Sequence, residues 1–248
     1  MACSSSDREQ TDPVKQQVAA HWDRRAAHFD EDFGHSIRTA AERAAWDRIL
    51  DLMLPTADAL EALDIGCGTG FLSLELASRE HRVTGIDFAP SMITQAREKA
   101  AERQATIRFE EADAEQLPFA AASFDIAVSR HLLWTLPHPE RAMDEWIRVL
   151  RPGGRLIIVD SQANVSASPE ALDNARRSPE YEAIGDRLRF PGGWPREEIV
   201  KLFAAHQLVN VASDPFLDLV AAEERRMEEE GLERRIRRRY AVWGDVPP

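Results

Sequence analysis

A glycine-rich segment near residue 66 is the first part of the chain whose composition suggests ligand binding. Gly66, Gly68 and Gly70 follow the apolar run Ala62–Ile65 at intervals of two residues. Glycine lets the backbone pass close to a bound molecule where a side chain would clash. A strand-to-helix turn that only needs positive φ angles would have the same composition. The glycines alone therefore leave ligand binding and a plain turn as equal interpretations.

The positions of two aspartates favour ligand binding. Asp87 ends the apolar run Val83–Ile86, 21 residues beyond Gly66, where a carboxylate can accept hydrogen bonds from both hydroxyls of a ribose. Asp87 could instead cap the following helix, although Ser91 is better placed to do so. Asp113 follows a third apolar run, whose end should lie beside that of the second. A ligand that contains a nucleoside fits these strand ends.

Asp64 indicates which nucleoside-containing ligand fits better. A dinucleotide-binding turn reads G-x-G-x-x-G and places a pyrophosphate at a helix N-terminus. Here the pattern is G-x-G-x-G, and Asp64 stands just before it. A carboxylate repels a pyrophosphate but attracts a cationic amino-acid group, which S-adenosylmethionine carries together with a sulfonium and a ribose. The pattern favours S-adenosylmethionine and leaves a nicotinamide-dependent oxidoreductase as the alternative.

Short apolar runs alternate with amphipathic segments around these residues, which predicts a parallel sheet covered by helices on both faces. The expected strands are Ala62–Ile65, Arg82–Ile86, Ile107–Glu110, Phe124–Ser129, Arg155–Val159, Leu208–Ala212 and Arg238–Trp243. The expected helices are Val14–Phe29, Ser36–Leu54, Gly70–Arg79, Ser91–Arg103, Glu140–Leu150, Arg196–His206 and Leu217–Glu230. Pro152–Gly154 is expected to be a turn before the fifth strand.

The pattern predicts one domain over residues 14–248, preceded by a disordered arm over residues 1–13 that is rich in serine and charge. Two regions are expected to form a lid over the substrate: the helices within residues 14–54, and an insertion over residues 162–195. The insertion is polar and contains helical pieces near Pro169–Arg177 and Glu180–Leu188. Such lids order on binding and complete a site.

Composition excludes several classes of function. The net charge of −12 opposes nucleic acid as a partner, and the arginines of Arg234–Arg239 have an acidic stretch just upstream to pair with. Two cysteines, Cys3 and Cys67, cannot form a disulfide framework, which favours a reducing, cytoplasmic setting. No apolar run reaches the roughly 18 residues of a membrane span. We expect a small-molecule substrate and a monomer or homodimer.

A metal site is not expected. His21, His28 and His35 recur every seven residues, but two helical turns separate ligands too widely for one ion. Gly34 also interrupts the helical pattern before His35. Cys67 has no cysteine close to it in sequence, which argues against a redox role.

Five segments together resemble the class I S-adenosylmethionine-dependent methyltransferases, in the small-molecule branch that includes the ubiquinone and menaquinone biosynthesis methyltransferases. The resemblance covers about Trp22 to Asp160. The segments that carry it are Leu63–Gly70, Gly85–Met92, Ala112–Phe119, Phe124–Ser129 and Arg148–Leu156. It implies a Rossmann-like α/β fold whose seven-stranded sheet is mostly parallel with an antiparallel last strand, and a helical lid.

The resemblance also implies roles for individual residues. Asp64 would meet the amino group of the methionine moiety, directly or through water, and Asp87 would bind the ribose hydroxyls. Asp113 would accept from the adenine amine. The other cofactor-binding residues that it implies are Gly66, Cys67, Gly68, Phe88, Met92, Ala114, Ser129 and Arg130, with Trp22 and Phe29 from the opening helix. Both aromatic residues would equally suit core packing.

Methyl transfer to a nucleophile is an in-line displacement, for which a protein mainly aligns the reactants and excludes water. A base is needed only when the acceptor must lose a proton early. His131, after the fourth strand, is the candidate base, although it could simply shape its loop. Trp134 and Asp160 are candidate substrate contacts. The expected function is methyl transfer to a small molecule, and a non-enzymatic cofactor sensor or scaffold is the further alternative.

Overall fold

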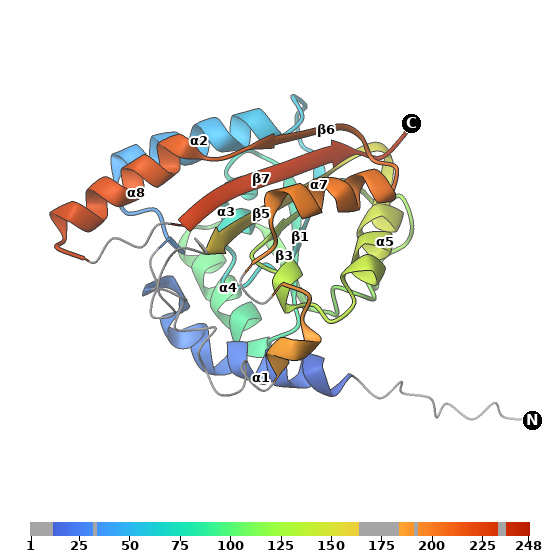
Figure 1. The fold of residues 1–248 in the computed structure, drawn as a ribbon, viewed down its shortest axis with the longest axis horizontal. Coiled ribbons are helices and arrows are strands. Elements are labelled where there is room, and N and C mark those ends of the chain that lie inside the picture. Colours follow the sequence, from blue (N-terminus) through green and yellow to red (C-terminus); the bar gives the residue numbers. More distant parts are fainter. Residues whose placement is uncertain (1–11, 32–33, 164–183, 191–192, 233–236) are drawn as a thin grey trace, which may run out of the picture.

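The computed structural model describes residues 12–31, 34–163, 184–190, 193–232 and 237–248. Its centre is a seven-stranded sheet in the order β3-β2-β1-β4-β5-β7-β6 (Figure 1). The first five strands pair in parallel, and β7 pairs antiparallel with both β5 and β6. The strands are β1 (Glu61–Ile65), β2 (Arg82–Asp87), β3 (Ile107–Glu111), β4 (Phe124–Arg130), β5 (Leu150–Ala163), β6 (Val209–Asp214) and β7 (Arg237–Asp245). This is the predicted sheet.

Helices cover both faces of the sheet because alternate residues of each strand point to opposite sides. In β4, Ile126 and Val128 belong to one hydrophobic cluster and Ala127 to another. The α-helices are α1 (Pro13–Arg25), α2 (Ala40–Met53), α3 (Phe71–Ala77), α4 (Pro90–Glu102), α5 (Pro139–Val149), α7 (Arg196–Ala205) and α8 (Leu217–Glu229). Three short 3₁₀ helices are described: η1 (Ala26–Glu31), η2 (Leu133–Thr135) and η5 (Gly185–Arg187).

Three details differ from the sequence-based expectations. The first helix begins at Pro13, and Asp12 caps it by accepting from the Val14 amide, so these two residues are not part of an arm. Residues 1–11 lie outside the described part of the chain. β5 starts at Leu150, and the expected Pro152–Gly154 turn is an irregularity within this strand: Gly153 has a φ of 77°, and the pairing with β4 shifts register there.

The third difference concerns α2, which was expected to be part of the lid. Its apolar face, with Trp46, Ile49 and Leu50, packs in the core against the sheet and α8 instead (Figure 1). α2 begins with a capping box, in which Thr39 and Glu42 each bond the other's backbone amide. Most of the expected 162–195 insertion lies outside the described residues.

Gly85 of β2 tests how tightly this core is packed. An added Cβ would lie 2.7 Å from the Phe109 ring and 2.9 Å from the Ser73 hydroxyl. Gly85→Ala should therefore lower the free energy of unfolding by about 1–3 kcal/mol through overpacking. Urea denaturation measures this, with Gly185→Ala as the control because nothing lies within 4 Å of the added Cβ there. Equal stability of the two variants would contradict the expectation.

Candidate cofactor site

A cavity lies at the carboxyl ends of the parallel strands, where open α/β sheets bind their ligands. Twelve of the residues predicted from sequence line it: Trp22, Phe29, Gly66, Gly68, Asp87, Phe88, Met92, Asp113, Ala114, Arg130, His131 and Trp134. Four do not: Asp64, Cys67, Ser129 and Asp160. Prediction from sequence missed lining residues such as Lys15, Val18, Ala19 and His35.

The glycine turn shapes one wall of this cavity. Gly66, Gly68 and Gly70 have φ angles of 67°, 54° and 86°, in the left-handed region that other residues rarely adopt. A Cβ on Gly66 would lie 2.8 Å from the Leu132 side chain. The turn therefore needs glycine for its backbone conformation and, at residue 66, for close packing as well.

Asp87 stands at the end of β2 and braces the glycine turn. Its two carboxylate oxygens accept from the amides of Gly68 and Ala89, each at 2.9 Å. Burial raises the pKa of Asp87 to about 6, although these amide bonds act in the opposite direction. Asp87 also lines the cavity, so it can contact a ligand while it holds the turn.

Asp64 lies behind the cavity wall rather than on it. It is buried, and the Ser73 hydroxyl of α3 donates to its Oδ2 at 2.6 Å. Burial raises its pKa to about 6. The Asp64 carboxylate is bonded to α3 and does not line the cavity, and its expected contact with a ligand amino group, directly or through water, stays a prediction.

Cys67 and Ser129 are also buried off the cavity. The Cys67 thiol bonds the Gly68 carbonyl at 3.6 Å, and burial raises its pKa well above the ordinary value. The Ser129 hydroxyl is buried and has no hydrogen-bond partner among the described residues. Both side chains therefore lie behind the cavity wall and not on it.

Arg130 brings a buried positive charge to the cavity. Its Nη2 donates to the Gly34 carbonyl at 3.0 Å, and the guanidinium lies 4.1 Å from the centre of the Phe71 ring. Burial, and then the charge of Arg239, lower its pKa to about 9. Nη1 is buried without a hydrogen-bond partner in the described structure. Arg130 thus has one unused donor group beside the cavity.

His131 and Asp160 form a polar pair at the ends of β4 and β5. The Nδ1 atom of His131 lies 3.1 Å from Asp160 Oδ1, which also accepts from the Ser161 amide at 2.7 Å. Asp160 is buried, whereas His131 lines the cavity. Asp160, a predicted substrate contact, does not line the cavity and lies within hydrogen-bond distance of His131.

Five aromatic rings form a continuous series along the cavity. Trp22 makes edge contacts with Trp134 and Phe29, at centroid distances of 6.1 and 5.8 Å. Phe29 lies 4.1 Å from His35, and His35 stacks on His131 at 6.1 Å. The series joins the N-terminal segment to the loop after β4, so the cavity is bordered by both.

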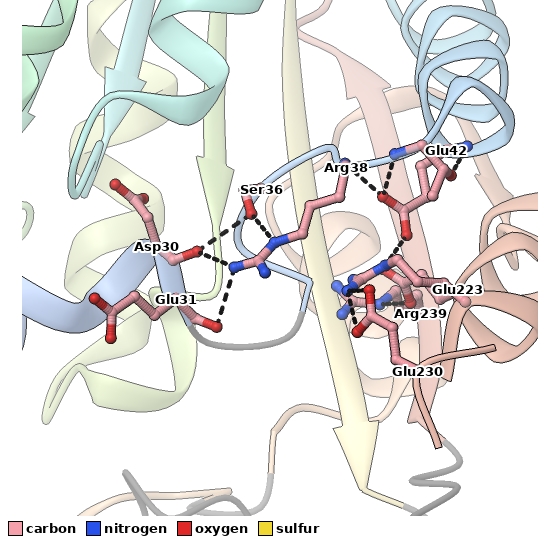
Figure 2. Close-up of polar contacts among 10 residues, drawn as sticks. Asp30, Glu31, Ser36, Arg38, Glu42, Glu223, Glu230 and Arg239 are labelled. Atoms are coloured by element: carbon pink, nitrogen blue, oxygen red, sulfur yellow. Dashed lines mark hydrogen bonds and ion pairs between the residues drawn. The ribbon is translucent and has the colours of Figure 1, made fainter. Parts of the chain in front are cut away.

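Polar contacts of Arg38, which does not line the cavity, anchor the loop that carries His35 (Figure 2). The guanidinium of Arg38 donates to the carbonyls of Asp30 and Glu31 and to the Ser36 hydroxyl. The Arg38 amide donates to Glu42 at 2.7 Å, and Glu42 in turn accepts from Arg226 of α8 at 2.6 Å. The loop is therefore fixed to both α2 and α8.

Comparison with known proteins identifies this arrangement. Residues 63–158 match the family described as Methyltransferase domain. Phosphatidylethanolamine N-methyltransferase of Cereibacter sphaeroides is 39% identical over 115 residues, which are 46% of this chain and 56% of that protein. Demethylmenaquinone methyltransferase of Thermus thermophilus is 42% identical over 115 residues, 46% of this chain and 52% of that protein.

These matches in sequence and fold support a class I S-adenosylmethionine-dependent methyltransferase. The fold agrees with that of solved members. A phosphoethanolamine N-methyltransferase of Haemonchus contortus, in complex with phosphomonomethylethanolamine and S-adenosylhomocysteine, superposes with a TM-score of 0.68 at 17% identity. That match covers 95% of this chain and 60% of the other.

Two further findings concern the length of the match and the search for membrane-spanning helices and metal sites. Its matched part spans only about half the length of these curated relatives, 56% and 52% of them. Within the described residues, no helix combines the length and apolar character needed to cross a membrane, and no group of three or more His, Cys, Asp or Glu residues is arranged to hold a metal ion.

Proposed function

We propose that this protein transfers the methyl group of S-adenosylmethionine to a small molecule that loses a proton from the reacting atom. The observation that carries the proposal is that His131, oriented by Asp160, faces the same cavity as the glycine turn and Asp87. A nucleotide-like ligand and a base can therefore act at one place.

The residues present suit S-adenosylmethionine. The glycine turn lets the backbone approach the ligand, Asp87 can accept from the ribose hydroxyls, and Asp113 can accept from the adenine amine. The unused Nη1 of Arg130 suits the carboxylate of the methionine moiety, because a buried donor group without a hydrogen-bond partner is costly. When bound, this cofactor supplies a methyl group already activated on a sulfonium.

The chain's own contribution to the reaction is alignment and proton removal. With Nδ1 held toward Asp160, the ring of His131 is oriented so that its other nitrogen can take a proton from the acceptor. Asp160 fixes the ring orientation and stabilises the imidazolium that forms. The aromatic series and the apolar loop over residues 132–137 exclude water and hold the acceptor in line.

The walls favour an acceptor with an apolar or aromatic body. Trp22, Trp134, Leu132 and Leu136 line the cavity around His131. The names of relatives, among them the demethylmenaquinone and 27-O-demethylrifamycin SV methyltransferases, are consistent with a small-molecule acceptor. A hydroxyl or amine on such a body matches a histidine base.

Isothermal titration calorimetry with S-adenosylhomocysteine and with NADH tests the cofactor. We expect the first to bind and the second not to bind. Transfer of tritiated methyl from S-adenosylmethionine to a panel of apolar hydroxyl and amine compounds then tests the reaction. NADH binding without S-adenosylhomocysteine binding would favour an oxidoreductase, and cofactor binding without any transfer would favour a sensor.

The affinity for S-adenosylhomocysteine should fall at acidic pH. The pKa of Asp87 is raised to about 6, so its carboxylate is ionised above that pH and takes up a proton below it. Protonation competes with the ribose hydroxyls, which should weaken binding by up to about tenfold per pH unit below pH 6. Burial raises the pKa, so protonation stabilises rather than unfolds the free protein through this group.

Calorimetry from about pH 5 to about pH 8, in two buffers with different ionisation enthalpies, measures this effect and should show proton release on binding near pH 6. An affinity that stays constant over this range would contradict the assignment of Asp87 to the ribose.

A further inference from the structure

The N-terminal helix α1 forms one wall of the cavity. Lys15, Val18, Ala19 and Trp22 follow the spacing of one helical face, and all four line the cavity. A ligand in the cavity therefore lies against α1, so the attachments of this helix can affect how easily the ligand leaves.

α1 continues into η1, and the C-terminal end of this α1–η1 segment is attached to the glycine turn and to α4. Asp23 accepts from the Ser91 amide at the start of α4 at 2.8 Å. Asp30, in η1, accepts from the Thr69 hydroxyl at 2.7 Å and pairs with Lys99. These contacts hold the helix at the end of the cavity that contains Phe29.

The N-terminal end is attached through Lys15. Its ammonium group lies 2.7 Å from Asp113 Oδ2 and 2.6 Å from Glu115 Oε2. The Glu115 side chain is completely buried, and only 11% of the Lys15 side chain is exposed. Glu115 Oε1 accepts from the His138 amide at 2.8 Å, so the carboxylate is held in place and the lysine supplies its counter-charge.

Lys15 thereby contacts the carboxylate that we assign to adenine. Asp113 Oδ1 already accepts from the Glu115 amide at 2.9 Å, and Oδ2 accepts from Lys15. An ionised carboxylate has about four acceptor positions, so the adenine amine can bind the same group while the lysine remains. A bound adenine would then share Asp113 with the helix that covers it.

We propose that Lys15 is a positioning residue that fastens α1 over the adenine end of the cofactor and thereby slows cofactor release. This inference rests on the proposed function, because it assigns adenine to Asp113. Lys15 holds the end of α1 that lies at Asp113, whereas Asp23 and Asp30 hold the other end. Release of the adenine from Asp113 therefore requires the Lys15 pair to open.

Surface plasmon resonance on the immobilised full chain, with S-adenosylhomocysteine as the probe, tests the proposal. We expect Lys15→Met to raise the dissociation rate by about tenfold, because it removes a nearly buried, charge-assisted pair. Lys15→Arg should restore the slow rate, because a guanidinium can pair with both carboxylates. Lys201→Met is the matched control, since that lysine is 72% exposed on α7 and pairs with Glu198.

A second variant separates loss of the contact from loss of folding. Lys15→Met leaves the buried Glu115 charge without its partner, which can destabilise the protein. Combining it with Glu115→Gln removes that charge, and the double variant should still release S-adenosylhomocysteine faster. In the protein without ligand, hydrogen exchange across Pro13–Arg25 should increase in both variants and remain unchanged in Lys201→Met.

Two results would overturn this inference alone. An unchanged dissociation rate in Lys15→Met would show that the pair does not control release. Tighter binding by that variant would show that Lys15 competes with adenine for Asp113 instead of covering it. Absence of S-adenosylhomocysteine binding to the unmodified protein would instead count against the proposed function itself.

Discussion

His131→Ala should lower the rate of methyl transfer by about 10²–10⁴-fold, the range that a positioned general base contributes. The affinity for S-adenosylhomocysteine should change little, because His131 is assigned to the acceptor proton and not to the cofactor. Transfer of tritiated methyl to an acceptor from the proposed panel measures the rate, and calorimetry measures the affinity.

Asp160→Asn is the companion variant, because it keeps the shape of the pair while removing the charge that orients Nδ1 of His131. It should lower the rate without abolishing transfer and move the rising limb of the pH–rate profile to lower pH, since the imidazolium loses its stabilising carboxylate. Full activity of His131→Ala would show that the acceptor needs no base from this residue.

Asp87→Ala should weaken binding of S-adenosylhomocysteine by more than about tenfold, equivalent to about 1.4 kcal/mol. The variant loses the ribose contact and also the two bonds that brace the glycine turn through Gly68 and Ala89. Titration calorimetry measures the loss. Asp51→Ala is the matched control, because the Asp51 side chain on α2 is 76% exposed and lies outside the cavity lining.

The more conservative Asp87→Asn shows whether unfolding explains a loss of binding. Removing the ionised carboxylate relieves the burial cost that raises the pKa of Asp87, but asparagine has one acceptor oxygen and loses one of the two amide bonds, so the melting temperature should fall less than in Asp87→Ala. Weak binding by a variant that remains folded at the assay temperature would support the assignment. Affinity unchanged in Asp87→Ala would show that Asp87 does not contact the ribose.

The sheet was predictable because each strand is a short apolar run bounded by polar or glycine residues. The same reasoning placed the β5 start too late, at Arg155 instead of Leu150. Pro152 and Gly153 are typical of a turn, and Gly153 does have a turn-like φ of 77°, but the segment is part of β5 and the Gly153 amide donates to the Val246 carbonyl. Pairing with distant parts of the chain continues the strand through this local irregularity.

The candidate site was predictable where residue type and strand position agreed, as for the glycine turn and Asp87. Asp64 has the right type and position, but its orientation depends on Ser73, nine residues later on α3. Lys15 and His35 gave too weak a signal, because only the tertiary fold brings the N-terminal segment over the strand ends. Lys15 does share the helical face of Val18 and Trp22, which was a usable clue.

The edge contact between Trp22 and Trp134 has a practical consequence. One indole belongs to α1 and the other to the loop after β4, and their rings lie 6.1 Å apart at an angle of 75°. Indoles this close couple electronically and produce a paired signal in far-ultraviolet circular dichroism, which disappears when they separate. Circular dichroism of the unlabelled protein should therefore report when α1 separates from the loop after β4.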